Sequence, residues 1–467
     1  MSQDTIVAIA TAAGRGAVGI VRVSGPATRT IMQEVCGRVL AARHATHLAF
    51  LDGQGNPIDD GLAIFFAGPN SYTGEDVLEL QGHGGIGVLS ALLNRCLSVP
   101  LKGADHPTGR IRLAEPGEFT RRAFLNDKLD LAQAEAVADL INAGSERAAR
   151  SALASLRGVF SQAVEGLQQR LTDLRARVEA CLDFPEEDLE FIEREGVAQR
   201  LLETQDSLKE TLLVAQQGAA LRDGLRVVLV GAPNVGKSSL LNALSGQEVA
   251  LVTEVAGTTR DRIVQEIVLQ GLVIHVVDTA GLRQTQDAVE QLGIARTWQE
   301  VEQAQAVLLV RDASGEIAID HELERRVLER VPAMCQVIEV NNKIDLLLAR
   351  RPAALSSPDK NDAVRGPVVI SSKTGQGLDQ LRAMLIEIAG LSEQPATGVF
   401  SARARHLRAL LSAQTDLLAA ESHLHQHQLE LLAECLGQAQ RHLAEITGEL
   451  SADDLLGEIF GSFCIGK

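Results

Sequence analysis

The first chemistry that the sequence suggests is phosphate binding, in the run GAPNVGKSS at residues 231–239. This run fits the phosphate-loop pattern G-x-x-x-x-G-K-[ST] without a mismatch. Its glycines allow backbone N–H groups to turn inward around an anion, and Lys237 supplies a positive charge for the outer phosphates. The Ser238 hydroxyl is placed to hold Mg²⁺. The predicted ligand is therefore a nucleoside triphosphate with its magnesium ion.

A second set of residues, nearer the C-terminus, selects the base of that nucleotide. The run NKID at residues 342–345 follows an apolar strand predicted at 337–340. The Asp345 carboxylate can accept hydrogen bonds from N1 and N2 of guanine, whereas adenine presents the wrong pattern. The run SSK at 371–373 is expected to close on guanine O6 and on the ring face. The sequence therefore predicts GTP rather than ATP.

Two further segments are typical of the loops that respond to the γ-phosphate. Asp278 ends an apolar strand predicted at 273–277 and can organise Mg²⁺, and Gly281 can sense the γ-phosphate through its backbone N–H. Thr259, in the run GTTRD at 257–261, is the natural second hydroxyl ligand to Mg²⁺. A loop of this kind can order around a triphosphate and relax after hydrolysis.

Hydrolysis needs a group that the sequence does not supply in the usual place. Small regulatory GTPases orient the attacking water with a Gln directly after the D-x-x-G motif, but here that residue is Leu282. Glu290, farther along, is a candidate carboxylate for positioning water, and its spacing fits a solvated surface residue equally well. The side-chain oxygen of Asn234 could help to hold a monovalent cation, whose charge could replace that of an arginine finger.

The elements around these motifs predict a multidomain α/β plus all-α chain. Residues 4–125 predict an α/β unit with strands at 5–10, 19–24, 61–66 and 76–81 and a helix at 88–96; its glycine-rich turns favour packing over ligand binding. From 129 to 182 the pattern is helical, with one continuous apolar stripe from Leu153 to Leu182. Helical patterns return at 196–221 and after Pro395.

The nucleotide motifs lie between these helical segments, on a predicted Ras-like doubly wound domain. The run LRVVLV at 225–230 predicts the buried strand before the phosphate loop, and SLLNAL at 239–244 the helix after it. Because short helical arms rarely bury their stripes alone, we expect one helical domain, split in sequence, into which the nucleotide domain is inserted. The predicted boundaries are 1–125, 126–222, 223–389 and 390–467.

Composition sets the class of protein. The 467 residues carry a net charge of −17, which argues against nonspecific phosphate binding by the whole surface but allows a local basic patch. One Trp and one Tyr argue against an aromatic platform for single-stranded nucleic acid. The six cysteines are scattered without C-x-x-C pairs, so neither a disulfide framework nor a structural zinc site is expected. Without a signal peptide or membrane span, a cytoplasmic setting is predicted.

The chain ends in GSFCIGK, with Cys464 close to the terminus. Its form fits a prenylation box poorly. Lys467 could favour the thiolate, so Cys464 could be a nucleophile, or it could be a small apolar anchor. The residues alone leave both interpretations open.

Taken together, these motifs resemble the MnmE (TrmE) family of tRNA-modifying GTPases over essentially the whole chain. The resemblance is strongest in AFLNDKLDL at 123–131 and FCIGK at 463–467, and it extends to YTGED at 72–76, GHGG at 82–85 and PGEFT at 116–120. It implies a folate-binding N-terminal domain, a discontinuous helical domain and an inserted G domain. It also implies a homodimer built on the N-terminal domains.

Site residues follow from the same resemblance. It implies Glu290 as the hydrolytic carboxylate and Cys464 as the site of the modification chemistry. A site for 5-formyl-tetrahydrofolate or a related folate would contain Arg22, Glu79, Lys128 and Lys467. Mg²⁺ would be held by Ser238 and Thr259, and K⁺ by Asn234, Thr253, Val255 and Thr258. The GTP-binding residues are then Asn234, Val235, Gly236, Lys237, Ser238, Ser239, Thr253, Glu254, Val255, Ala256, Gly257, Thr258, Thr259, Asp278, Thr279, Ala280, Gly281, Asn342, Lys343, Ile344, Asp345, Ser371, Ser372 and Lys373.

Members of this family act with a FAD-containing partner, MnmG (GidA), in a heterotetrameric or larger complex. The resemblance implies addition of an aminomethyl or carboxymethylaminomethyl group to C5 of the wobble uridine of certain tRNAs, with a one-carbon unit from a tetrahydrofolate. Two alternatives belong to other classes. A ribosome-assembly GTPase usually carries a basic RNA-binding appendage, whereas this chain has an acidic, folate-like N-terminal domain and a Cys near its end. A scaffold with vestigial hydrolysis should tolerate the loss of Glu290.

Overall fold

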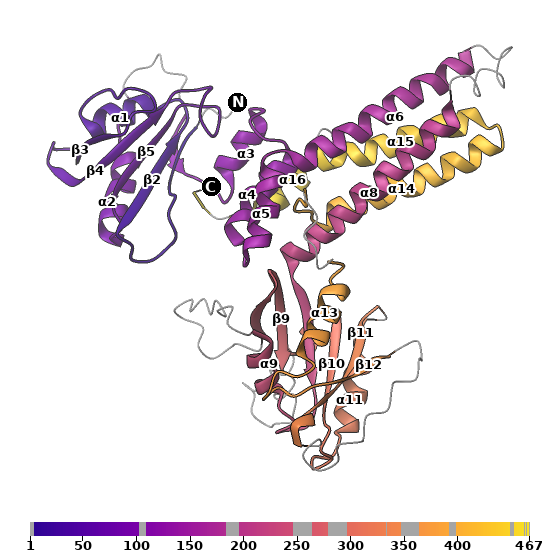
Figure 1. Cartoon of the computed structure of the whole chain (residues 1–467). Coiled ribbons are helices and arrows are strands. Elements are labelled where there is room, and N and C mark those ends of the chain that lie inside the picture. The colour runs from indigo at the N-terminus through magenta and orange to yellow at the C-terminus, as the bar shows by residue number, and fades with distance from the viewer. Residues whose placement is uncertain are drawn as a thin grey trace. The chain divides into compact units, whose positions relative to one another are not determined.

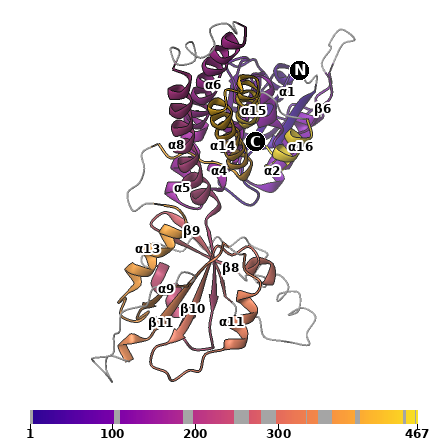
Figure 2. The same ribbon diagram turned by 90° about the vertical axis from the view of Figure 1, so that its right-hand side faces the viewer.

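The structure is a computed structural model that describes residues 4–101, 109–183, 196–245, 264–278, 297–332, 334–346, 364–391, 398–448, 453–461, 463, 465 and 466. The chain divides into two compact units (Figures 1 and 2). One contains Met1–Ala138, Ser155–Thr204 and Ser412–Lys467, and the other contains Asp139–Ala154 and Gln205–Leu411. No helix in the described ranges is both long and apolar enough to cross a membrane.

The first unit begins with a six-stranded sheet in the order β3-β4-β5-β2-β1-β6. Its paired strands are antiparallel except for the parallel pair β1–β6. Alternate residues of β5, such as Leu78 and Leu80, join Leu92 of α2 in the core. The elements are β1 (Thr5–Ile9), β2 (Val18–Ser24), α1 (Thr28–Cys36), β3 (Thr46–Leu51), β4 (Pro57–Phe66), β5 (Val77–His83), α2 (Ile86–Leu97) and β6 (Ile111–Leu113).

All four strands predicted in this segment are present, but α1, β3, β6 and the helix Glu118–Leu125 were not predicted. The strand predicted at 61–66 is the second half of β4, whose first half carries Asp59 and Asp60. The strand β3, with the sequence THLAFL, is apolar enough to be recognised, but only Phe50 in it is buried. The helix α1 buries Ile31, Met32 and Val35 on one face. Its apolar residues are few, so its helical period is weak in the sequence.

The predicted continuous stripe from Leu153 to Leu182 is wrong in one respect: it belongs to two helices, α5 (Glu146–Leu156) and α6 (Val159–Asp183). The break is at Gly158, whose φ of +86° lies in the left-handed region. Its N–H bonds to the Ser155 carbonyl at 2.9 Å, and its own carbonyl starts the next helix by accepting from Gln162. Spacings of four residues continue across the break, so the apolar period does not reveal it.

The predicted pairing of helices across the insertion is confirmed by α6 and α15 (Leu429–Thr447), which lie side by side (Figure 1). Leu171 and Leu174 of α6 and Leu432 and Leu436 of α15 are fully or almost fully buried. Within the ranges that the structure describes, the remaining helices outside the nucleotide domain are α3 (Glu118–Leu125), α4 (Leu131–Asn142), α8 (Val197–Asp223), α14 (Ala404–His425) and α16 (Asp453–Gly461).

The second unit contains a six-stranded sheet in the order β12-β11-β10-β7-β9-β8, parallel except for β8. Helices α9 and α13 cover one face and α11 the other (Figure 2). The carboxyl ends of the parallel strands lie at one edge, where nucleotides bind in such folds. The elements are β7 (Leu225–Val230), α9 (Lys237–Ser245), β8 (Val264–Leu269), β9 (Leu272–Asp278), β10 (Ala306–Asp312), α11 (His321–Leu328), β11 (Gln336–Asn342), β12 (Val364–Val369) and α13 (Leu378–Ile388).

The chain enters and leaves this nucleotide domain at one place. A Cβ at Gly218, near the end of α8, would lie 1.7 Å from the carbonyl oxygen of Phe400, so only glycine fits there. Beside this crossing, Asp139 of α4 accepts hydrogen bonds from Arg222 at 3.0 Å and from Arg403 at 2.7 Å. One buried carboxylate thus binds both the incoming and the outgoing segment.

Candidate functional site

The predicted phosphate loop connects β7 to α9. Gly236 has a φ of +98°, and a Cβ there would lie 2.4 Å from Nδ2 of Asn342. Glycine is therefore needed both for the backbone conformation and for the close approach of the base-recognition motif. Asn234 also has a positive φ, +61°, which asparagine tolerates better than most residues.

The side chains of the loop differ in exposure according to their predicted roles. Lys237 is buried, and its ammonium donates to the carbonyl oxygens of Gly231 at 2.8 Å and Ala232 at 3.2 Å. Asn234, Ser238 and Ser239 are exposed. The loop thus places a cation inside and offers hydroxyl and amide groups outside, where a phosphate and its metal ion would be bound.

Hydrogen bonds join the base-recognition motifs to the phosphate loop. Asn342 donates from Nδ2 to the Val235 carbonyl at 3.0 Å, and its Oδ1 accepts from both the N–H and the hydroxyl of Ser372 at 3.0 Å. The Ser371 hydroxyl donates to Asp345 Oδ1 at 2.7 Å. The structure therefore brings three predicted segments into one network, with Lys373 exposed and Ile344 buried beside them.

One charged partner in this network was missed by sequence reasoning. Asp312, at the carboxyl end of β10, is buried and lies 3.1 Å from the Lys343 ammonium. Burial tends to raise the pKa of Asp312, but hydrogen bonds from Ser314 and the nearby Lys343 outweigh it, so this pKa lies below its usual range. The run AVLLVRD at 306–312 could have predicted this residue, because it is an apolar strand that ends in a carboxylate.

Most of the predicted residues near the γ-phosphate lie outside the described residues, and of Asp278 only the backbone is described. Asp278 is placed as the last residue of β9, opposite Leu229 of β7, which puts its backbone close to the start of the phosphate loop. The remaining positions without a description are Thr253, Glu254, Val255, Ala256, Gly257, Thr258, Thr259, Thr279, Ala280, Gly281, Glu290, Cys464 and Lys467.

A second site lies on the N-terminal sheet, where the C-terminal tail meets β2. Arg22 forms an ion pair with Glu79 at 2.9 Å and donates to the Gly466 carbonyl at 3.2 Å. Its guanidinium lies 5.8 Å from the ring centre of Tyr72 and 5.7 Å from that of Phe119. The predicted residues Arg22 and Glu79 are thus in contact, next to two aromatic rings.

Lys128 belongs to a neighbouring groove of about 440 Å³. It is exposed on the turn between α3 and α4, and its side chain passes within 3.5 Å of where a Cβ at Gly74 would be. Neither Arg22 nor Glu79 lines this groove. The structure therefore joins two of the predicted folate residues directly and places the third on an adjacent surface.

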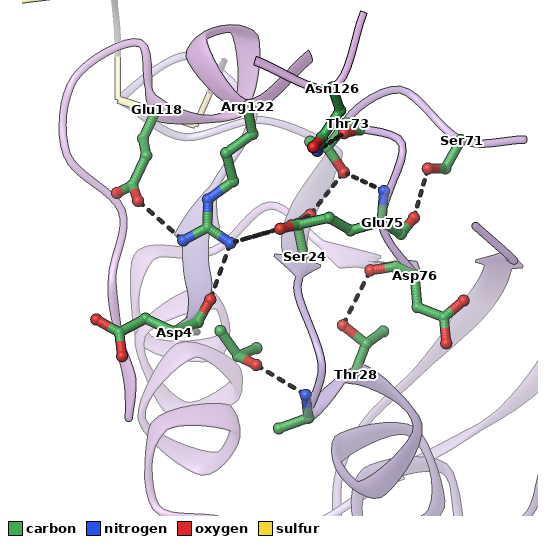
Figure 3. Close-up of polar contacts among 12 residues, drawn as sticks. Asp4, Ser24, Thr28, Ser71, Thr73, Glu75, Asp76, Glu118, Arg122 and Asn126 are labelled. Carbon is green, nitrogen blue, oxygen red and sulfur yellow. Dashed lines mark hydrogen bonds and ion pairs between the residues drawn. The ribbon is translucent and has the colours of Figure 1, made fainter. Parts of the chain in front are cut away.

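A buried ion network supports this second site (Figure 3). The Arg122 guanidinium contacts Glu75 at 3.0 Å, Glu118 at 2.9 Å and the Asp4 carbonyl at 2.8 Å. The Ser24 hydroxyl extends the network to Glu75 at 2.7 Å. The motifs YTGED and PGEFT, far apart in sequence, are thus two sides of one charged cluster that holds α3 against the sheet.

Ionisation of this cluster is favoured by its hydrogen bonds. Burial tends to raise the pKa of Glu118, but hydrogen bonds from Arg112, the Glu115 N–H and Arg122 outweigh burial, so the pKa lies below its usual range. Burial raises the pKa of Tyr72, whose hydroxyl is within 2.8 Å of Thr120. Glu118 is therefore charged and Tyr72 neutral at physiological pH.

Comparison with known families identifies the family to which this chain belongs. A family model described as the MnmE helical domain matches residues 131–464, and one described as the GTP-binding protein TrmE N-terminus matches residues 5–128. The chain belongs to the MnmE family of tRNA modification GTPases. The predicted fold class is thereby confirmed: a TrmE-type α/β N-terminal domain, a helical domain and a P-loop GTPase-like domain.

Curated MnmE relatives match over nearly their full length. A tRNA modification GTPase MnmE of Polaromonas naphthalenivorans is 52% identical, over 99% of this chain and 98% of that protein. One from Ralstonia nicotianae is 53% identical, over 99% and 96%. Among solved structures, the FeoB G-domain of Methanococcus jannaschii is 24% identical, covers 36% of this chain and 97% of its own, and has a TM-score of 0.24. A variant of Era from Aquifex aeolicus, bound to GDP and aluminium fluoride, is 25% identical, over 41% and 66%, with a TM-score of 0.24.

Proposed function

We propose that this chain is a K⁺- and Mg²⁺-dependent GTPase that acts with a FAD-containing MnmG partner. The pair adds an aminomethyl or carboxymethylaminomethyl group to C5 of the wobble uridine of certain tRNAs, with a one-carbon unit from a tetrahydrofolate. The observation that carries this proposal is the hydrogen-bonded set of Val235, Asn342, Asp345 and Ser371 in a chain that belongs to the MnmE family.

In the GTPase step, each described side chain has a separate task. Lys237 neutralises the outer phosphates, Asp345 binds the guanine edge, and Asn342 keeps the base site in register with the phosphate loop. The exposed Ser238 hydroxyl and Asn234 amide oxygen are hard oxygen donors, which suit Mg²⁺ and K⁺ respectively. When bound, these ions would offset the negative charge that develops on the transferred phosphoryl group.

The folate site is proposed at Arg22 and Glu79. The Glu79 carboxylate offers acceptors beside the donors of the Arg22 guanidinium, and the rings of Tyr72 and Phe119 lie 5.8 Å and 5.7 Å from that guanidinium. This chemistry suits a flat heteroaromatic ring with a polar edge, such as a pterin. Lys128 and Lys467 are proposed to bind the folate carboxylates by charge.

Cys464 is proposed to take part in the modification chemistry at the end of the same tail. The residues beside it are anchored on both sides: Phe463 is buried, and a Cβ at Gly466 would lie 2.4 Å from the Ile9 carbonyl. These anchored neighbours of Cys464 in the sequence support assigning the modification chemistry to the C-terminal tail.

The homodimer is proposed to form through the N-terminal sheet. Val18, Leu62 and Ile86 are apolar side chains with 59%, 40% and 62% of their surface exposed. Val18 pairs with His83 of β5 and Leu62 with Gln81 of the same strand, which puts both side chains on one face of the sheet, on either side of β5. A second copy would cover this apolar surface.

The test of the proposed function is GTP turnover by the purified chain in K⁺ and in Na⁺ at matched ionic strength. We expect strong stimulation by K⁺ and a loss of about 10²- to 10³-fold in Glu290→Ala, because the carboxylate that positions water would be gone. Glu316→Ala, a carboxylate of the same domain outside the predicted site, is the control. Turnover that is indifferent to both the cation and Glu290 would refute the mechanism.

Binding of 5-formyl-tetrahydrofolate tests the second site. We expect Arg22→Gln to raise the dissociation constant for this folate by about tenfold to a hundredfold, because a charged hydrogen-bond donor is lost and Glu79 is left without its ion pair. Titration calorimetry measures this directly. Arg43→Gln is a matched control, since Arg43 also lies over an aromatic ring, that of Phe66 at 5.9 Å. Equal folate affinity in the Arg22→Gln and Arg43→Gln variants would show that folate does not bind at Arg22.

A further inference from the structure

The helical pair α6–α15 carries a polar groove that no role described so far uses. It has a volume of about 320 Å³, and its lining residues come from two turns of each helix. None of them is acidic, although the whole chain carries a net charge of −17. The groove is lined by Gln168, Thr172 and Arg175 of α6 and by Gly437, Gln440 and Arg441 of α15, with Ala444 at one end.

Two guanidinium groups converge at the floor of this groove. A Cβ built on the buried Gly437 would lie 3.7 Å from Nη1 of Arg175 and 3.9 Å from Nη1 of Arg441. The two cations therefore approach the same point from different helices. Like charges that converge without a carboxylate between them are stabilised when an anion joins them.

Hydrogen bonds hold Arg175 in place, whereas Arg441 is oriented only by the charge of a nearby carboxylate. Arg175 bonds to Glu179 through Nε at 2.7 Å and approaches Gln440 Oε1 at 3.4 Å, and Gln440 in turn donates to Thr172 at 2.8 Å. Asp416 of α14 attracts Arg441, but no ion pair within 4.0 Å joins the Arg441 guanidinium to another side chain in the described ranges. The groove thus presents a preorganised donor set with one cation still available.

We propose that this groove binds a backbone phosphate of RNA, namely of the tRNA on which the proposed function acts. Arginine donors match phosphate oxygens in bidentate geometry, and amide and hydroxyl donors such as Gln168 and Thr172 are common additional phosphate contacts. A protein partner would be expected to place an aromatic or aliphatic anchor in its pocket, but this groove offers only Gly437 and Ala444 as apolar surface. The inference rests on the proposed function for its choice of RNA.

The test measures binding of an unmodified tRNA transcript to the full chain at several salt concentrations. The double variant Arg175→Gln with Arg441→Gln should lose two phosphate contacts. We expect the slope of log affinity against log salt to flatten by about 1.5, and the affinity to fall about tenfold near 0.1 M salt. The control is Arg150→Gln with Arg325→Gln, which removes the same charge from two exposed ion-paired arginines outside the groove.

A second variant blocks the groove without removing either arginine. Gly437→Glu places a carboxylate between the two guanidinium groups, where the distances to a Cβ leave ordinary van der Waals room. It should weaken tRNA binding as much as the double variant, whereas Gly437→Ala should bind like the unaltered chain. Circular dichroism and GTP turnover should be unchanged in all of these variants.

The other outcomes overturn the proposal. Groove variants that bind tRNA as well as their controls, or an unaltered chain that binds no tRNA, would show that the groove is not a phosphate site. Retained tRNA binding with loss of the FAD-containing partner would make it a protein interface instead. Potassium-stimulated GTP turnover, measured on the same preparations, reports separately on the proposed function.

Discussion

Replacing Asp345 by Asn is expected to lower the affinity for GTP by roughly 10⁴-fold and to create affinity for xanthosine triphosphate. The Ser371 hydroxyl already occupies one lone pair of the Asp345 carboxylate, so the rest of that group faces the base site. An amide N–H₂ placed opposite the guanine N–H donors leaves two donors facing each other. Xanthine has a carbonyl at C2 where guanine has an amino group, and that carbonyl can accept a hydrogen bond from the Asn N–H₂.

Competition binding with GTP, ATP and xanthosine triphosphate measures this exchange of specificity. Asp379→Asn is the matched control. It makes the same chemical change in the same domain, but at an exposed residue in the first turn of α13. Its nucleotide affinities should match those of the unaltered chain. An Asp345→Asn variant that still prefers GTP would show that another residue reads the base.

Replacing Arg122 by Met is expected to destabilise the N-terminal unit by about 3–5 kcal/mol. The Arg122 side chain is only 4% exposed and lies between the buried Glu118 and the partly buried Glu75, so its removal takes a cation away from both carboxylates. Of the two, Glu118 keeps Arg112 as a partner, whereas the Glu75 carboxylate loses its ion pair. The cost is therefore that of a partly buried charge without its ion pair rather than that of one hydrogen bond.

Thermal unfolding, followed by calorimetry so that the separate units can be resolved, measures this loss. Arg150→Met removes an exposed arginine from an i,i+4 ion pair with Glu146 and should change stability by no more than about 0.5 kcal/mol. Adding Glu118→Gln to Arg122→Met should cost less than the sum of the single changes, because the two residues share one network. Additive losses would mean that Arg122 stabilises the unit through packing alone.

The nucleotide site could be predicted from sequence because its parts are contiguous runs with fixed internal geometry. The phosphate loop, the NKID run and the SSK run each follow a short apolar strand, and parallel strands bring their carboxyl ends to one edge. Asp312 escaped because its strand had no motif attached to it. Its role becomes visible only when β10 and β11 are placed side by side and Lys343 reaches across them.

The second site shows the opposite case. Arg22 and Glu79 are 57 positions apart, and Arg22 and Gly466 are 444 apart, so no local pattern connects them. Composition and periodicity could place Arg22 on a strand but could not say which residue faced it. The same holds for Arg122 and Glu75, whose pairing depends on how α3 packs on the sheet. For Arg22 and Glu79 only the family resemblance carried the prediction, and the pair of Arg122 and Glu75 was not predicted.

The crossing at Gly218 and Phe400 has a consequence for how such a chain could arise. Since the polypeptide leaves the nucleotide domain where it entered, that domain can be inserted or deleted as one unit without changing the path of the helices beside it. Inserting a nucleotide domain into a helical protein in this way needs only two junctions, and these lie close together at Gly218 and Phe400. Surgical excision with a short glycine linker between α8 and α14 would then leave the helical host with its own hydrophobic contacts intact.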